Sequence, residues 1–237
     1  MDSVFFIFIV VVFGALVLLF AYHAYQQQQK RIAGLTALAR KLGWQFDSGR
    51  DYSHEDEYSQ FAVFHRGHSR YAYNGLRGTM DVGGQTYRAK MGDYHYRITS
   101  GSGKSRSTRT YTFSYLIVDL PYARVPNLYL REEGIFDALA GFLGFDDIDF
   151  ESAEFSKRFH VKSRDKKFAY DVIHPGMMEF LLAREPPTVD IEQSQCCLVD
   201  GNDTCWSAAE FEGRLDWARQ FFELWPKHLV ATLNTTL

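Results

Sequence analysis

The chain has 237 residues, with 26 lysines and arginines against 29 aspartates and glutamates, and a formal net charge of −3. Aromatic residues make up 16% of it, which argues against a disordered chain because disordered chains lack the apolar side chains needed for a core. The acidic balance gives no reason to expect a nucleic-acid partner. Three cysteines are an odd set and do not form a disulfide framework.

The N-terminal segment differs sharply from the rest. Every residue from Val4 to Tyr22 is apolar, counting Gly14 and Tyr22 themselves, which makes a run of 19 residues. As a helix this run would be about 28 Å long, close to the hydrocarbon thickness of a bilayer. It lacks the basic start and the small-residue cleavage site of a signal peptide. We therefore expect an uncleaved transmembrane anchor over residues 1–30, with the lipid bilayer as the partner of residues 4–22.

The basic residues next to this run predict its orientation. None precedes the run, and four follow it: Lys30, Arg31, Arg40 and Lys41. The positive-inside rule then keeps the C-terminal side in the cytoplasm. Leucines and an isoleucine at helical spacing continue the helix to Gly43, where it should stop. We expect a juxtamembrane helix and polar linker over residues 31–60 and a cytoplasmic domain over residues 61–237.

A β-rich region opens this domain. The strings "SRYAYNGLRGTM" and "QTYRAKMGDYHYRIT" are separated by "DVGG", which predicts a hairpin. In the second string the aromatic residues change parity after Gly92, and a bulge there would explain the change. The string "TRTYTFSYLIVDLP" alternates as a half-buried strand does. "NLYLREE" and "SKRFHVKSRD" should add further strands.

Helices are predicted between and after these strands. "GIFDALAGFLGF" is a short apolar helix, and "KKFAYDVI" with "PGMMEFLLAR" is a helix interrupted at Pro175. "TVDIEQSQCCLVD" and "TCWSA" should pair around "GND". Ser207 and Glu210 form a capping box before a closing amphipathic helix. The order predicts an antiparallel β-rich α+β domain, which is compatible with a pleckstrin-homology-like barrel.

The string "GSGKS" at Gly101–Ser105 is similar to the end of a phosphate-binding loop. A Walker A loop needs a glycine five residues before Gly103, where this chain has Ile98, and a helix after the lysine, where this chain has a strand pattern. We therefore interpret the string as a hairpin tip and predict no nucleotide cofactor.

This tip lies in a strongly basic region. Residues 61–112 hold nine basic residues and two acidic ones, a net charge of +7. We expect an anion or lipid contact at the tip, through Arg97, Lys104, Arg106 and Arg109, because a cytoplasmic leaflet attracts cations close to its surface. The alternative is internal pairing with residues 132–154, which hold eight acidic residues and no basic one.

The acidic segment Asp147–Glu154 raises the possibility of a metal. It begins with the spacing of a calcium loop but has Ser152 where the glycine belongs and Arg158 where the closing glutamate belongs. Neither the eight histidines nor the cysteines have the spacing of a metal motif. We predict no metal, and keep as an alternative a membrane-tethered hydrolase or metal-dependent enzyme built on Asp147, Asp149, Glu151 and His160.

Several strings carry a family resemblance. "FHRGHSRYAYNGLRG", "GDYHY", "DLP" and above all "DIDFESAEFSKRFHV" resemble an uncharacterised family of bacterial proteins with an N-terminal membrane helix before a domain of this kind. The resemblance covers roughly residues 43–183, and its most specific part is residues 147–159. It implies a bacterial inner-membrane protein and assigns no catalytic residue. Without a catalytic motif, we expect a binding or scaffolding module that contacts anionic lipid or a protein partner.

Overall fold

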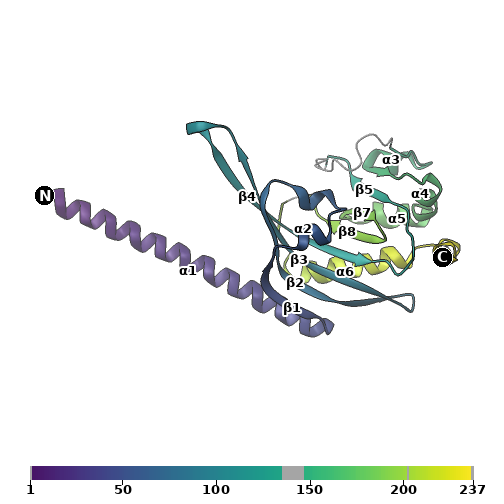
Figure 1. The fold of residues 1–237 in the computed structure, drawn as a ribbon, viewed down its shortest axis with the longest axis horizontal. Coiled ribbons are helices and arrows are strands. Elements are labelled where there is room, and N and C mark those ends of the chain that lie inside the picture. Colours follow the sequence, from purple (N-terminus) through teal and green to yellow (C-terminus); the bar gives the residue numbers. More distant parts are fainter. Residues whose placement is uncertain (1, 135–146, 202, 236–237) are drawn as a thin grey trace.

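A computed structural model describes residues 2–134, 147–201 and 203–235 of the chain (Figure 1). The fold is α+β, with one eight-stranded antiparallel sheet in the order β1-β2-β3-β4-β8-β7-β5-β6. The strands are β1 (Gln45–Asp51), β2 (His68–Val82), β3 (Gln85–Ser100), β4 (Ser107–Asp119), β5 (Leu128–Glu132), β6 (Phe159–Lys162), β7 (Thr188–Glu192) and β8 (Gln195–Val199). The helices are α1 (Asp2–Leu42), α2 (His54–Glu57), α3 (Ala153–Arg158), α4 (Lys166–Val172), α5 (Pro175–Leu182), α6 (Ala208–Glu223) and α7 (Lys227–Thr235), with 3₁₀ turns η1 (Ala62–His65) and η2 (Gly103–Ser105).

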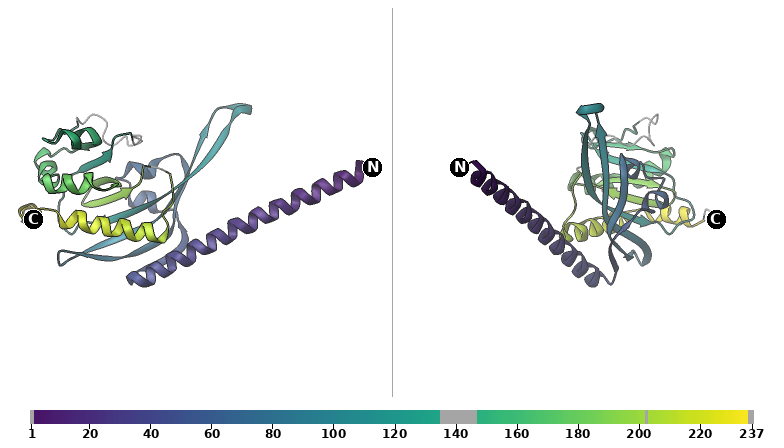
Figure 2. Two further views of the ribbon diagram at one scale, coloured as in Figure 1. Left: turned by 180° about the vertical axis from the view of Figure 1, so that it is seen from behind. Right: turned by 60° about the vertical axis from the view of Figure 1, so that its left-hand side comes forward.

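Both faces of the sheet are buried, and each has its own core. On one face the C-terminal half of α1 packs Leu35 and Leu38 beside α6 and the apolar residues of β2, β3 and β4. On the other face the segment that contains α2 and η1 covers Tyr94 and Tyr115. Figure 2 shows α1 and α6 on the same side of the sheet. Odd-numbered residues of β3 therefore pack in one core and even-numbered residues in the other.

Several sequence expectations are confirmed by this fold. The hairpin around "DVGG" is β2–β3, and the interrupted helix is α4 and α5 with Pro175 at the start of α5. The capping box of Ser207 and Glu210 opens α6. α1 ends at Leu42, and Gly43 has a φ of 69°, the left-handed conformation expected at a helix end.

Other expectations are wrong. β3 pairs with β4 from Arg88 to Ser100 without a register shift, so β3 itself has no extra residue at Gly92; the extra residue belongs to β2, where Asn74 and Gly75 lie opposite Gly92. The parity change instead reflects the two cores, and the irregular pairing lies in β2 between Tyr73 and Leu76. "DSGRDYSHEDEYSQ" is not a loop, because it contains the end of β1 and all of α2.

The C-terminal hairpin turns at Gln193–Ser194 rather than at "GND", and "TCWSA" is not a strand. The apolar helix expected at "GIFDALAGFLGF" lies almost wholly outside the described residues. A pleckstrin-homology-like barrel is not confirmed, because the described strands form one sheet with the order given above. Residues 31–60 contribute to the domain core and sheet through α1 and β1.

The transmembrane prediction falls on the first half of α1. Within the described part of the chain, no helix is long and apolar enough to cross a membrane. The side chains of Val4, Ile7, Ile9 and Val10 are outside that part. The anchor therefore stays a prediction that the structure does not support.

Candidate functional site

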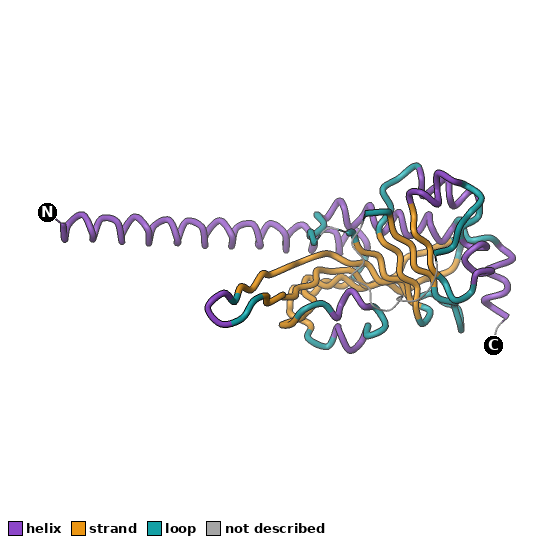
Figure 3. Tube along the Cα trace, turned by 90° about the horizontal axis from the view of Figure 1, so that it is seen from above, coloured by secondary structure: helices purple, strands orange, loops and turns teal. Residues whose placement is uncertain are grey.

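The residues expected at the hairpin tip lie on a two-stranded projection of the sheet. Pairing of β3 with β2 ends at Arg97, and pairing of β4 with β8 begins at Tyr115, so the hairpin between them extends past its neighbours. We call residues 97–111 the arm. Figure 1 shows the arm projecting from the domain near β4, and Figure 3 shows it extending toward the same end of the molecule as the N-terminal half of α1.

The turn of the arm depends on glycine. Gly101 has a φ of 81°, and a Cβ atom there would lie 2.5 Å from the carbonyl oxygen of Ser105. The Ser105 hydroxyl donates to the carbonyl oxygen of Ser102 at 2.9 Å, which closes the turn. The string "GSGKS" thus forms a compact hairpin tip, as the failed Walker A spacing indicates.

Three of the four expected contact residues present free charge. Arg97, Arg106 and Arg109 are exposed, and none forms an ion pair with any residue that the structure describes. The side chain of Lys104 lies outside the described residues. The other five basic residues of this region form ion pairs with acidic residues, as follows: Arg66 with Asp203, Arg70 with Glu55, Arg77 with Asp51, Arg88 with Asp119, and Lys90 with Asp51 and Glu57. None of these partners belongs to residues 132–154, and the three arginines of the arm are without an ion pair within the described ranges of the chain.

The acidic segment does not have the open arrangement of side chains that the enzyme hypothesis requires. Ile148 and Phe150 are buried, whereas Asp147, Asp149 and Glu151, which alternate with them, are exposed. Asp147 contacts Nδ1 of His160 at 2.5 Å, while Glu133 contacts Nε2. Both ring nitrogens of His160 are therefore engaged by carboxylates and neither faces an open position. Within the described residues the segment contributes no trio of metal-ligand side chains, and the enzyme alternative stays a prediction.

A buried salt bridge joins α1 to the base of the arm. Asp93 of β3 is fully buried and accepts two hydrogen bonds from Arg31 of α1, at 2.9 Å from Nε and 2.6 Å from Nη2. Asn74 donates to the same carboxylate at 2.8 Å and Ser114 at 2.6 Å. A carboxylate with four such donors is well satisfied despite its burial. Asp93 thereby fixes α1 against the strand that continues into the arm.

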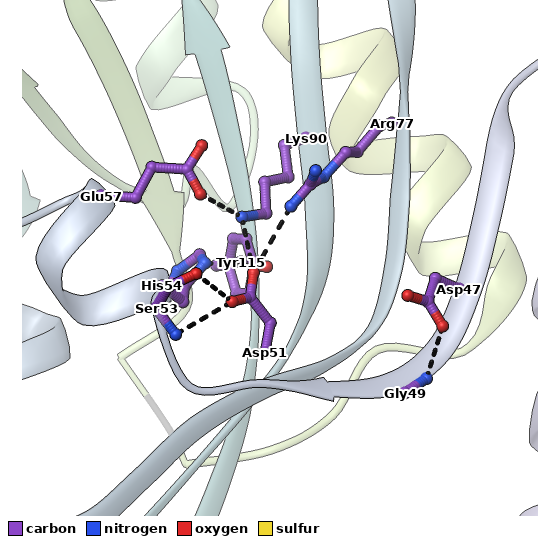
Figure 4. A network of polar contacts seen from close by, with 9 residues as sticks. All are labelled: Asp47, Gly49, Asp51, Ser53, His54, Glu57, Arg77, Lys90 and Tyr115. Carbon is purple, nitrogen blue, oxygen red and sulfur yellow. Dashed lines mark hydrogen bonds and ion pairs between the residues drawn. The ribbon is translucent and has the colours of Figure 1, made fainter.

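A second polar cluster connects β1, α2 and β3 (Figure 4). We call Asp51, His54, Glu57, Arg77 and Lys90 the Lys90 cluster. The Lys90 ammonium lies 3.2 Å from Oδ2 of Asp51 and 2.9 Å from Oε2 of Glu57. Arg77 approaches the same oxygen of Asp51 at 3.4 Å. Two carboxylates are thus balanced by two cations, and the ammonium holds α2 against β3.

His54 lies in an aromatic box at the centre of this cluster. The rings of Tyr58, Phe64, Tyr94 and Tyr115 surround it at centroid distances of 4.5–5.6 Å. Burial, reinforced by the charge of Lys90, lowers the pKa of His54 to about 3. The imidazole is therefore neutral at physiological pH, and its Nε2 atom has no hydrogen-bond partner among the described residues.

The pKa of Asp51 is also perturbed. Its partial burial acts to raise the pKa, but hydrogen bonds from Ser53 and the charge of Lys90 outweigh this, and the net shift is downward. Ser53 donates to Oδ1 of Asp51 through both its backbone nitrogen, at 3.1 Å, and its hydroxyl, at 2.7 Å. Asp51 is therefore held as a carboxylate at the end of β1.

This cluster has the side chains of a metal site but already contains a cation. One ligand atom from each of Asp51, His54 and Glu57 lies within 4.8 Å of the others. The Lys90 ammonium contacts both carboxylates, so a divalent ion would meet a positive charge and a charge-balanced network. We conclude that Lys90 is the cation of this cluster.

Sequence reasoning missed both buried networks. Lys90 and Asp93 were expected to be ordinary charges of the basic region, whereas both are buried in β3. The available signal was their position inside the apolar strand pattern around Met91, because a charged residue in a strand buried on both faces needs a partner. Their partners Arg31, Asp51 and Glu57 are far away in the sequence and could not be identified from spacing.

Comparison with known proteins adds information on the fold alone. No protein-family model matches the chain, and no curated protein matches it. One solved structure that is similar is the crystal structure of the mycobacterial trehalose monomycolate transport factor A, TtfA. The match has a TM-score of 0.52 and 11% sequence identity, and covers 85% of this chain and 95% of that chain. At that identity the likeness extends to the fold and not to the residues of a site.

Proposed function

We propose that this protein is a membrane-anchored binding module in which α1 holds the domain at a bilayer and the arm contacts an anionic partner beside it. The observation that carries the proposal is that the apolar half of α1 and the arm with its free arginines extend toward the same end of the domain (Figures 1 and 3). An anchor and a charged contact surface would then reach the same membrane face.

The apolar half of α1 needs an apolar environment. Eleven of its large apolar side chains, between Phe5 and Phe20, are 41–76% exposed. Residues 16–20 are consecutive and all are exposed, so they cover every side of a helix with 3.6 residues per turn. A protein groove covers one side of a helix, whereas lipid surrounds it. The sequence run of 19 apolar residues, which includes the four whose side chains are not described, supports the bilayer as that environment.

The proposed orientation keeps the domain in the cytoplasm of a bacterial cell, with a single span in the inner membrane. Its support is the charge asymmetry about the apolar run, since Lys30, Arg31, Arg40 and Lys41 all follow it. The arm would then face the cytoplasmic leaflet and any protein beside it. Each arginine near an anionic surface contributes about 1 kcal/mol, and salt weakens the contribution.

The similar solved structure is a distant likeness in fold and does not test a binding role. That protein is named a transport factor for trehalose monomycolate. A binding module that assists a process at the membrane is compatible with that name, but likeness of fold alone does not transfer a cargo.

Extraction from membranes tests the anchor. The full chain should stay in the membrane pellet after an alkaline carbonate wash, whereas a fragment that starts at Gln26 should be soluble. This fragment retains Arg31 and the packed part of α1, so circular dichroism should show that it is folded. A full chain that the wash releases would refute the anchor.

A fluorescent label tests the position of the arm. An environment-sensitive dye on Ser102→Cys, at the tip, should respond when the full chain is reconstituted into anionic vesicles or with a membrane partner. The same dye on Lys167→Cys, in α4, is the matched control and should respond less. Equal responses at the two positions would contradict a membrane-facing arm.

A further inference from the structure

We propose that the outer edge of β4 in the arm, Ser107–Tyr111, is a docking edge for an extended acidic segment of a partner protein, which adds to the sheet as an antiparallel strand. This inference rests on the proposed function, because it specifies the partner of the same arm. Two features of β4 support the docking edge: its free backbone groups and the positive charge around them.

The edge of β4 is occupied along one half and open along the other. β8 pairs with β4 from Tyr115 to Asp119, and the backbone nitrogen of Ser114 donates to the carbonyl oxygen of Thr204 at 3.1 Å. Toward the tip, no described strand continues on that side of β4. A strand added at Ser107–Tyr111 would pair with the same side of β4 as β8 does.

The direction of the free backbone groups can be read from these bonds. Ser114 and Leu120 both donate their backbone N–H groups away from β3, to Thr204 and Ser194. Because the direction alternates along a strand, other even-numbered residues of β4 direct their N–H and C=O groups to the same side. The outward backbone groups of Thr108 and Thr110 thus have no ladder partner among the residues that the structure describes, and they are suited to strand addition.

The composition of the edge also favours strand pairing. It contains no proline or glycine, and its threonines are β-branched residues that pack well in strands. A two-stranded ribbon is marginally stable by itself in water, so a third strand would stabilise the arm. Contact with lipid headgroups would use the arginines but would leave the backbone ladder without a partner. The backbone therefore favours a protein segment over a lipid surface.

Charge identifies the chemistry of that segment. Arg109 lies within the edge and Arg106 directly precedes it; both are exposed and have no ion-pair partner in the described part of the chain. Residues that face each other across antiparallel strands lie about 5 Å apart, so carboxylates of the added strand would pair with Arg109. We therefore expect an acidic segment, and a lysine-bearing one would be repelled.

A second copy of this chain does not fit the edge. Antiparallel pairing of two identical β4 edges would make the two arms point in opposite directions. Because α1 extends toward the same end as the arm, the two anchors would also point in opposite directions and could not both enter one bilayer (Figure 3). The arginines at both edges would add like-charge repulsion. The occupant is therefore a different chain.

A proline substitution separates the backbone edge from the charge. Thr110→Pro removes an outward N–H that makes no bond to β3 and leaves Arg106 and Arg109 unchanged, and proline is tolerated at such edge positions. Thr110→Ala is the matched control. Hydrogen exchange of the β3–β4 amides checks that the arm is still formed in both variants.

The probe is a labelled peptide, Thr-Glu-Thr-Val-Thr-Glu-Thr, titrated with the full chain in zwitterionic nanodiscs and followed by fluorescence anisotropy. We expect the peptide to bind the wild type and Thr110→Ala equally, and Thr110→Pro at least tenfold more weakly. A control peptide with lysine in place of both glutamates should bind the wild type at least tenfold more weakly than the acidic peptide. Equal binding to the two Thr110 variants, or no binding of the acidic peptide at millimolar concentration, overturns the proposal.

The lipid alternative is measured in parallel. If the dye on Ser102→Cys responds to anionic nanodiscs but not to the acidic peptide in zwitterionic nanodiscs, and Thr110→Pro responds to the anionic lipid as strongly as the wild type, the arm binds lipid and the strand proposal is wrong. The carbonate wash on the same preparation tests the anchor independently. The anchor and the docking edge can thus fail separately.

Discussion

Removal of the Arg31 guanidinium should destabilise the protein far more than neutralisation of its partner. Arg31→Met leaves the Asp93 carboxylate, whose side chain is fully buried, without its counter-ion. Breaking a buried pair in this way costs about 3–5 kcal/mol. Asp93→Asn instead leaves Arg31, which is 24% exposed and can reach water, and an amide that can still accept from Ser114. We expect Asp93→Asn to lower the free energy of unfolding by about 1–2 kcal/mol.

Urea unfolding of the soluble fragment from Gln26, followed by tryptophan fluorescence, measures both losses. The difference should also appear in the melting temperature, as a fall of about 6–20 °C for Arg31→Met in a domain of this size. Lys41→Met is a matched control, because the ion pair of Lys41 with Glu212 is largely exposed and should contribute less than about 1 kcal/mol. If Arg31→Met costs no more than Lys41→Met, the salt bridge does not hold α1 against the sheet.

Three further predictions concern buried groups. The pKa of His54 is about 3 in the folded state and about 6.5 in the unfolded state, so between these pH values the unfolded state binds one more proton. The free energy of unfolding should therefore fall by up to about 1.4 kcal/mol per pH unit as the pH drops from 6.5 to 3. His54→Gln should reduce that slope in urea unfolding. Burial, with Glu192 nearby, raises the pKa of Asp190 to about 8, so stability should fall as the pH rises from about 4 to 8, and an Asp190→Asn variant that keeps this slope would contradict the assignment. Lys90→Met should cost about 2 kcal/mol, because it leaves Glu57 without its cation and Asp51 with Arg77 alone, and Zn²⁺ should then raise the melting temperature of the variant but not of the wild type.

Local sequence signals were sufficient for most elements of the fold. Gly43, the "DVGG" turn, Pro175 and the Ser207 capping box each act through the backbone of their own segment, and the structure places a helix end or turn at each. The segment after Gly43 could not be assigned in this way. β1 has mostly exposed side chains and an irregular pairing with β2, so it lacks the alternation that identifies a strand.

The candidate site residues likewise differ in whether local sequence could identify them. The basic tip of the hairpin was visible because its charges are close in sequence and exposed. The Asp93 salt bridge was not, because Arg31 and Asp93 are 62 residues apart and only the packing of α1 across the sheet brings them together. His54 was hidden for a related reason: "SHEDE" has the pattern of an exposed acidic turn, and three of the four rings around His54 come from β3, β4 and η1.

The net charge of +7 in residues 61–112 suggested, from sequence, either pairing with residues 132–154 or contact with an external anion; in the structure, five of the nine basic residues pair with carboxylates that lie outside residues 132–154. Arg77 and Lys90 lie in the part of the sheet that β1 and α2 cover, and their carboxylate partners come from those two elements. Arg106 and Arg109 lie beyond the paired parts of β2 and β8, and the part of β3 that runs beside them, residues 97–100, has no acidic residue. Pairing within the domain would stabilise the fold, whereas charge left on a projecting arm does not, because like charges on a two-stranded ribbon repel one another. The cost of keeping them there is best explained by a contact outside the domain, which is why the arm rather than the Lys90 cluster is the functional surface that we propose.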